Sequence, residues 1–201
     1  SEYLSQPMSV SATEVTQTAK NVAGVSNKDV ELLDMNIVTV GDKDVKSLSA
    51  VTVDLKNSQS SISKVSLYSL ATADDAIAKD AVPVATADID GTASESVLTL
   101  AEPQALVEGN NYFRILCDIS DDAKAESVVD LAVKSLTLGS DVVTVENGDP
   151  EGAVIVKSMY ILKSGDNGEV PVASDQPLMF YDDGGVPYAP RLVNYAAPEN
   201  N

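Results

Sequence analysis

Hydrophobic and polar residues alternate with a period of two along most of the chain, and turn-forming residues interrupt the alternation about every 8 to 12 positions. Residues 62–70 show the pattern most clearly, because nearly every second position there is apolar. Such a segment predicts a β-strand with one face in a core and the other in water. The same pattern predicts strands over 30–40, 45–55, 96–100, 111–119, 128–138 and 153–162, and an edge or lid strand within 8–18.

These strands predict an all-β fold, an antiparallel β-sandwich with a jelly-roll-like topology over residues 8–163. Two short segments, 72–78 and 120–125, are predicted to form single helical turns capped by Thr72 and Ser120. The core is predicted to contain Leu33, Met35, Ile37, Val51, Val53, Val65, Leu67, Leu98, Phe113, Ile115, Cys117, Val133, Leu136, Ile155 and Tyr160.

The composition changes near residue 164. Five of the nine prolines lie in 164–201, and proline lacks the N–H group that a sheet ladder needs. We therefore predict a domain boundary at this point, followed by an irregular, proline-rich C-terminal tail. Residues 164–201 are then a linker, a packed tail, or the truncated start of a following module.

The charge balance narrows the choice of partners. The chain has 31 Asp and Glu against 13 Lys and Arg, which gives a formal net charge of −18. A surface of this sign repels phosphate backbones and anionic lipid headgroups, so nucleic acid and membrane surfaces are not expected partners. No stretch approaches the roughly 18 apolar residues of a membrane-spanning helix.

The residue types that are missing exclude most catalytic chemistry. The chain has no His, one Cys and two Arg, so neither a Ser-His-Asp triad nor a zinc site of the usual kind is available. No glycine-rich phosphate-binding motif occurs. We therefore expect no enzyme activity, no cofactor and no metal, and we expect Cys117 to be a buried, unreactive thiol.

Carboxylates suggest two further sites, each with a simpler interpretation. Asp118, Asp121 and Asp122 follow a strand and have the ligand type that calcium prefers. The simpler interpretation is that Asp118 accepts N–H groups from 120–123 as a cap. Glu169, Asp182 and Asp183 have the carboxyl groups that a glycosidase uses as an acid and base pair. Asp182 and Asp183 are adjacent, however, and adjacent residues of a strand point to opposite faces, which argues against these two as the pair.

Three tyrosines of the tail, Tyr181, Tyr188 and Tyr195, are predicted to be more accessible than the aromatic residues of the strands. Sugar rings stack on exposed aromatic side chains. These residues are thus possible contacts for a glycan or a partner, and the alternative is that they pack within the tail.

Residues 106–123 read LVEGNNYFRILCDISDDA. This segment resembles the sandwich domain that precedes the catalytic propeller in BNR-repeat sialidases of Gram-negative anaerobes, with its pattern L-x-E-G-x-N-Y-F-W followed by D-I-x-x-D-A. Arg114 stands where that family usually has Trp. The resemblance covers roughly residues 10–163, and residues 179–185 are similar to the opening of CUB-like modules.

The resemblance implies that the chain is a noncatalytic accessory module of an exported, glycan-degrading or cell-surface protein. It also implies that this protein is secreted, periplasmic or bound to the cell surface of a Gram-negative bacterium. Its partner would be a neighbouring catalytic or adhesive domain of the same polypeptide, which it positions. The alternative is a carbohydrate-binding module that recognises host or dietary glycans. Sialidase catalysis itself is not expected, because that family uses three arginines and this chain has only Arg114 and Arg191.

Overall fold

A computed structural model describes residues 4–163, 169–173, 180–181, 187–188 and 191–194, with side chains as far as residue 158. Within these residues every regular element is a strand. The strands are β1 (Ser9–Gln17), β2 (Val22–Gly24), β3 (Val30–Val40), β4 (Ser47–Asp54), β5 (Ile62–Leu70), β6 (Ala85–Asp88), β7 (Glu95–Ala105), β8 (Gly109–Ile119), β9 (Val128–Val129), β10 (Ala132–Leu138), β11 (Asp141–Thr144), β12 (Val154–Lys157), β13 (Met159–Lys163), β14 (Glu169–Ala173), β15 (Phe180–Tyr181), β16 (Pro187–Tyr188) and β17 (Arg191–Asn194).

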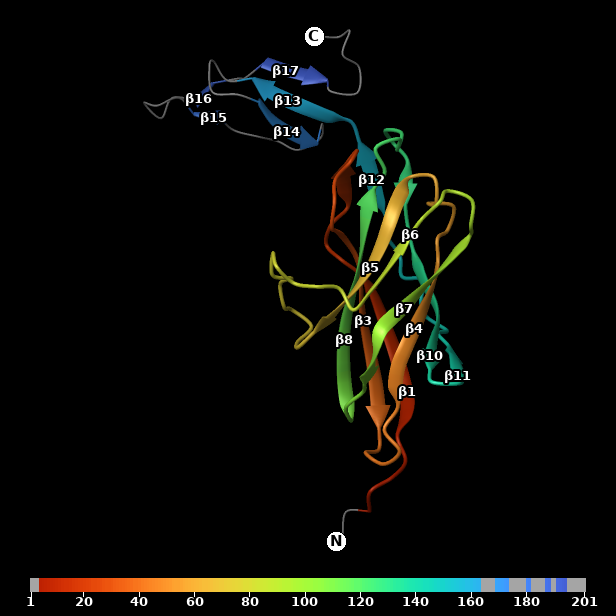
Figure 1. The fold of residues 1–201 in the computed structure, drawn as a ribbon. Coiled ribbons are helices and arrows are strands. Elements are labelled where there is room, and N and C mark those ends of the chain that lie inside the picture. Colours follow the sequence, from red (N-terminus) through yellow and green to blue (C-terminus); the bar gives the residue numbers. More distant parts are fainter. Residues whose placement is uncertain (1–3, 164–168, 174–179, 182–186, 189–190, 195–201) are drawn as a thin grey trace.

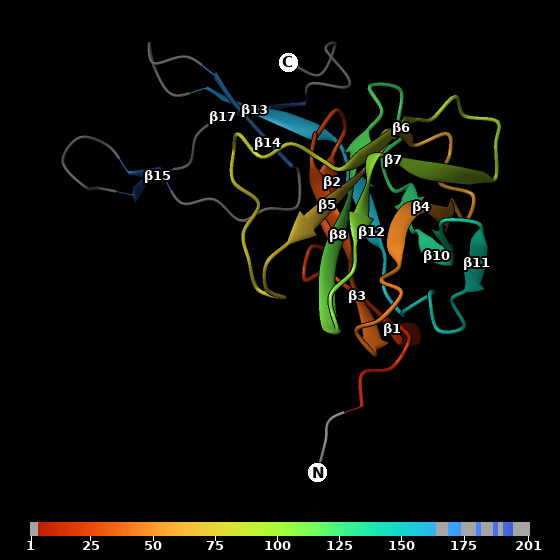
Figure 2. The same cartoon turned by 60° about the horizontal axis from the view of Figure 1, so that its bottom comes forward.

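Two antiparallel sheets form the body of the protein (Figures 1 and 2). The first has five strands in the order β1-β3-β8-β5-β6, and the second has four in the order β11-β10-β4-β7. The chain changes sheet repeatedly, from β3 to β4 to β5 and from β6 through β7 and β8 to β10. The jelly-roll-like topology stays a prediction. The predicted all-β antiparallel sandwich is confirmed.

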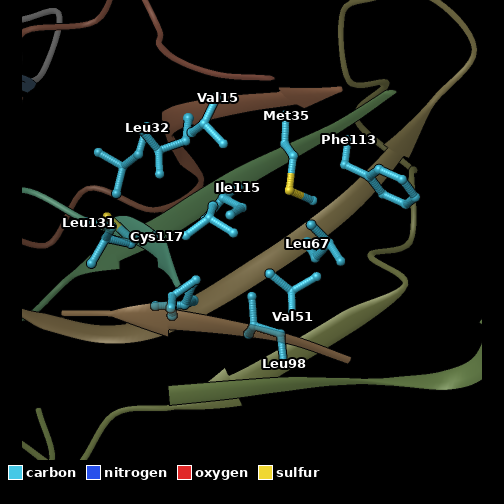
Figure 3. Close-up of a cluster of buried hydrophobic side chains, with 14 of the residues drawn as sticks. Val15, Leu32, Met35, Val51, Leu67, Leu98, Phe113, Ile115, Cys117 and Leu131 are labelled. Atoms are coloured by element: carbon cyan, nitrogen blue, oxygen red, sulfur yellow. The ribbon is translucent and has the colours of Figure 1, made fainter. Parts of the chain in front are cut away.

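The space between the two sheets is filled with apolar side chains (Figure 3). All the predicted core residues from Leu33 to Leu136 are at most 2% exposed. The alternation through Leu33, Met35 and Ile37 places Leu32 on the outer face, but Leu32 is also buried. A β-bulge between Glu31 and Leu33 explains this, because the extra residue breaks the period of two.

The predicted strand 153–162 is divided in the structure. Its first part, β12, pairs with β2 in parallel and with β9 antiparallel, and its second part, β13, pairs with β14 and β17. Val154 and Val156 are buried while Ile155 is half-buried, so the prediction of Ile155 as a core residue is wrong. A one-residue error in register moves the whole apolar set of a strand to the other face. The side chain of Tyr160 lies outside the described ones.

Two other segments differ from the expectation. Residues 72–78 and 120–125 form hydrogen-bonded turns and irregular chain, and neither contains a helix. Within 164–201, which was predicted to be irregular, the described residues include the short strands β14 to β17. The predicted domain boundary near residue 164 stays a prediction.

Candidate functional site on the outer face of the five-stranded sheet

Strand β8 lies at the centre of the five-stranded sheet and sends alternate side chains to opposite faces. Phe113 and Ile115 enter the core (Figure 3), so Tyr112 and Arg114 lie on the outer face. Arg114 is nevertheless only 7% exposed, because the connection between β5 and β6 folds over it. An arginine buried on the outside of a sheet requires an explanation, and its contacts supply one.

The guanidinium of Arg114 binds both the sheet and the covering segment. Its Nε–H donates to Asp34 Oδ1 at 2.6 Å, and Nη1 lies 3.4 Å from Glu31 Oε1. Nη1 also donates to the carbonyl oxygen of Asp75 at 2.8 Å, and Nη2 to that of Ala73 at 3.3 Å. Burial lowers the pKa of Arg114, but the hydrogen bond and charge of Asp34 and the charge of Glu31 raise it above its usual value. The charged side chain of Arg114, on β8, therefore links β3 to the β5–β6 connection.

The covering segment has its own local support. The carboxylate of Asp75 accepts the N–H groups of Ala71 and Thr72 at 3.1 Å each, and the Thr72 hydroxyl at 2.7 Å. The hydroxyl and N–H of Thr72 lower the pKa of Asp75 below its usual value. Thr72, which is predicted to be the capping acceptor, is here a donor, and the acceptor is Asp75. The turn holds the two carbonyl groups that Arg114 binds.

A row of polar side chains crosses the same face beside Tyr112. Asn36 Nδ2 donates to Asn110 Oδ1 at 3.0 Å and lies 3.3 Å from Glu14 Oε2, which links β1, β3 and β8. Tyr112 is half-buried and lies opposite Asn36 in the β3–β8 ladder. Sequence reasoning missed this row. Polar residues occupy outward-facing positions in three separate strands, but the sequence does not show that these strands are neighbours in the sheet.

An open groove of about 410 Å³ lies between this face and the covering segment. Its charged lining consists of Arg114 and the carboxylates of Glu31, Asp34, Asp74 and Asp75. An excess of carboxylates disfavours an anionic ligand such as a sialate carboxylate. Among the residues that the structure describes, no group of three or more Cys, Asp or Glu is placed to hold a metal ion.

The predicted role of Asp118 needs a correction. Its Oδ1 accepts the N–H of Asp29 at 2.9 Å, a residue in left-handed conformation with φ of 53°. The turn after β8 has a different acceptor, because Ser120 Oγ accepts the N–H of Asp122 at 3.1 Å. Asp118 therefore accepts a backbone N–H as expected, but from the turn before β3 and not from its own turn.

Replacing Asp118 by asparagine is expected to change the melting temperature by at most a degree or so, because the amide oxygen keeps an acceptor. Alanine removes the acceptor and is expected to cost about 1 kcal/mol, or a few degrees in melting temperature. Thermal unfolding with and without EDTA measures both effects. If EDTA destabilised the unmutated chain and calcium restored it, the hydrogen-bond role would be wrong.

Cys117 is buried beside Asp118, at 1% exposure. Burial, and to a lesser extent the charge of Asp118, raise the pKa of its thiol above the usual value. The folded state therefore holds the proton more tightly than the unfolded state. This contribution to stability is complete below the unfolded thiol pKa of about 8.5 and is lost progressively above it.

We expect Cys117 to react with a thiol reagent only as fast as the protein unfolds. Between pH 7.5 and pH 9.5 the unmutated chain should lose more unfolding free energy than the C117A variant does. Chemical denaturation at the two pH values compares the chains. Rapid labelling of the native protein would contradict the inert role.

The other predicted site residues lie beyond residue 158, where the structure describes strands but no side chains. Tyr181 lies in β15 opposite Pro187, and Tyr188 lies in β16 opposite Phe180. Tyr195 lies outside the described residues, so a glycan contact by this set stays a prediction. Arg191 begins β17, Glu169 begins β14, and Asp182 and Asp183 lie outside the described residues.

The fold and the outer face define a class, an antiparallel β-sandwich in which the buried Arg114 binds groups of its own chain. No protein-family model and no curated protein sequence matches the chain. A solved structure, "Hadza microbial sialidase Hz136", has a similar fold, with a TM-score of 0.53 and 14% sequence identity. The match covers 76% of this chain but 32% of the sialidase chain. The chain thus corresponds to about a third of that protein and shares a β fold with it.

No helix within the described residues is long and apolar enough to cross a membrane.

Proposed function

We propose that the chain is a noncatalytic accessory module of an exported, glycan-degrading or cell-surface protein. In this role the sandwich positions a neighbouring catalytic or adhesive domain of the same polypeptide, outside the cytoplasm of a Gram-negative bacterium. The fold similarity to one third of a sialidase chain supports a module that accompanies other domains. It also agrees with the resemblance of residues 106–123 to the domain that precedes a sialidase propeller.

The contacts of Arg114 carry the noncatalytic part of the proposal. Sialidase chemistry of the kind implied by the resemblance needs a cluster of arginines free to bind a carboxylate. Arg114 instead binds two carboxylates and two carbonyl groups of its own chain. The chain has one other arginine, Arg191, so such a cluster requires residues from elsewhere.

Carbohydrate binding is the second candidate, and the polar row beside Tyr112 is the observation that favours it. The row offers amide and carboxylate groups next to a partly accessible aromatic ring, which is the chemistry that binds a sugar. The tail tyrosines Tyr181, Tyr188 and Tyr195 offer a second aromatic group for the same role.

Two measurements on the full chain test the proposal. Hydrolysis of a fluorogenic sialoside should show no turnover above a buffer control, and reproducible turnover would overturn the noncatalytic role. Electrophoresis through gels containing mucin or plant polysaccharides should show no sugar-dependent retardation. Retardation that the Tyr112→Ala variant loses would replace the spacer role by carbohydrate binding at the outer face, whereas Y181A and Y188A test the tail.

A further inference from the structure

Strands β1 and β11 are the outermost strands on one side of the sandwich. In the described part of the chain, β1 pairs in its sheet only with β3, and β11 only with β10. Figures 1 and 2 show both strands along the same side. On the opposite side, the N–H of Ala101 in β7 donates to the carbonyl oxygen of Val84 before β6, at 3.2 Å. A backbone hydrogen bond therefore connects the two sheets at the side of β6 and β7, whereas β1 and β11 leave the other side open.

The ladder between β1 and β3 fixes the direction of the backbone groups of β1. The N–H of Thr18 donates to the carbonyl oxygen of Leu32 at 2.9 Å, and the two residues are opposite each other in register. Hydrogen-bonded and non-hydrogen-bonded pairs alternate in an antiparallel ladder. Thr16 and Glu14 thus bond to β3, whereas the N–H and carbonyl of Thr13 point away from it.

The same argument applies to β11. The N–H of Val145 donates to the carbonyl oxygen of Lys134 at 3.0 Å, in register with the β10–β11 ladder. Val143 is then a hydrogen-bonded position, and the N–H and carbonyl of Thr144 point away from β10. Each edge thus has an unpaired backbone position.

Thr13 and Thr144 line one open groove of about 320 Å³ between the two strands. Val10 and Val143 contribute its apolar part and pack against the core. The β-bulge between Val10 and Ala12 bends β1 at the groove. Apolar side chains between two unpaired strand edges are what an added β-strand requires.

Charge identifies the kind of strand that fits. The groove is lined by one charged side chain, Glu146, and by no Lys or Arg. A second copy of this chain would bring a further net charge of −18 to the contact, and like charges oppose association. Neither β1 nor β11 contains Lys or Pro, the residues that usually protect edges from pairing. A positively charged partner is not repelled by the acidic surface of this chain.

We propose that the groove between β1 and β11 binds an extended, positively charged segment of a partner protein by β-strand addition. The backbone of the segment hydrogen-bonds to Thr13 and Thr144, its apolar side chains contact Val10 and Val143, and its basic side chains face Glu146. This binding is independent of the accessory role, because it depends only on the open side of the sandwich.

Selection of a phage-displayed library of random peptides of about ten residues against the full chain tests the proposal. Enriched peptides should alternate apolar residues with Lys or Arg. Thr13→Pro removes the unpaired N–H and leaves the ladder with β3 intact, so it should weaken a synthetic enriched peptide about tenfold. The matched control Thr13→Val keeps the N–H and should bind within about twofold of the parent. Glu146→Lys should weaken binding and reduce its salt dependence.

Circular dichroism establishes that each variant is folded, and T144P replaces T13P if the latter is not. Failure to enrich any peptide would overturn the proposal, and so would peptides that bind the Thr13→Pro and Thr13→Val chains equally. Self-association of the parent that Thr13→Pro abolishes would assign the groove to a second copy and would also overturn it.

Discussion

Replacing Arg114 by methionine is expected to lower the free energy of unfolding by about 3 kcal/mol. The loss of one partner leaves Asp34 and Glu31 without their cation, and the carbonyl groups of Ala73 and Asp75 without their donor. Removing one member of a buried ion pair usually costs about 3–5 kcal/mol, and the partial exposure of the two carboxylates, 35% and 43%, places the value at the lower end. Urea unfolding of the two chains measures the difference.

The same substitution should release the covering segment. Lys79 is exposed in the β5–β6 connection, and we expect trypsin to cleave after it slowly in the unmutated protein, because Arg114 holds the segment. Cleavage there should be several-fold faster in R114M. The control Arg114→Lys keeps the charge but loses the planar fork, so it should recover part of the stability and little of the protection. Equal cleavage rates in all three chains would show that Arg114 does not hold the segment.

Replacing the neighbouring Phe113 by alanine is expected to cost about 3–5 kcal/mol of unfolding free energy. Phe113 is fully buried between the two sheets, and its ring contacts the core near Met35 and Leu67 (Figure 3). Alanine removes the apolar surface and leaves a cavity, because the strands around it are fixed by their ladders. A single domain of this size has roughly 5–15 kcal/mol in all, so F113A should lose a large share of its stability and melt well below the unmutated chain.

The control for this cavity is Phe113→Leu, which keeps most of the volume and should cost roughly half as much or less. Melting temperatures from calorimetry rank the three chains. A loss under 1 kcal/mol in F113A would mean that the two sheets do not enclose this side chain as tightly as its burial indicates. Neither substitution should alter the outer face, so Arg114 provides an internal check through protection from trypsin.

The two neighbours also show how far the sequence predicts the structure. The burial of Phe113 follows from the alternation along one strand, which is local information. The burial of Arg114 depends on the segment that covers it, some forty positions earlier in the chain. Local alternation carries no signal for such a cover, and arginine normally remains exposed.

The errors have the same origin. Leu32 is missing from the predicted core because a bulge breaks the period of two there, and Ile155 is predicted on the wrong face of β12 by a one-residue error in register. Asp118 was given a donor in its own turn, whereas its partner is Asp29, 89 positions away. In each case the residue type predicted the kind of contact, and the strand order decided with which residue it forms.

The strand order of the five-stranded sheet also sets when the protein folds during synthesis. Its central strand, β8, begins at residue 109 and must insert between β3 and β5, which have emerged from the ribosome long before it. The four-stranded sheet is equally late, since β10 completes the other side of β4. Pairings between such distant segments form slowly, and the edges of β3, β4 and β5 stay open until then. A nascent chain that stops before β8 can pair β1 with β3, β5 with β6 and β4 with β7, but it cannot join the first two pairs into the five-stranded sheet. General chaperones are expected to bind such a chain until residue 138 has emerged.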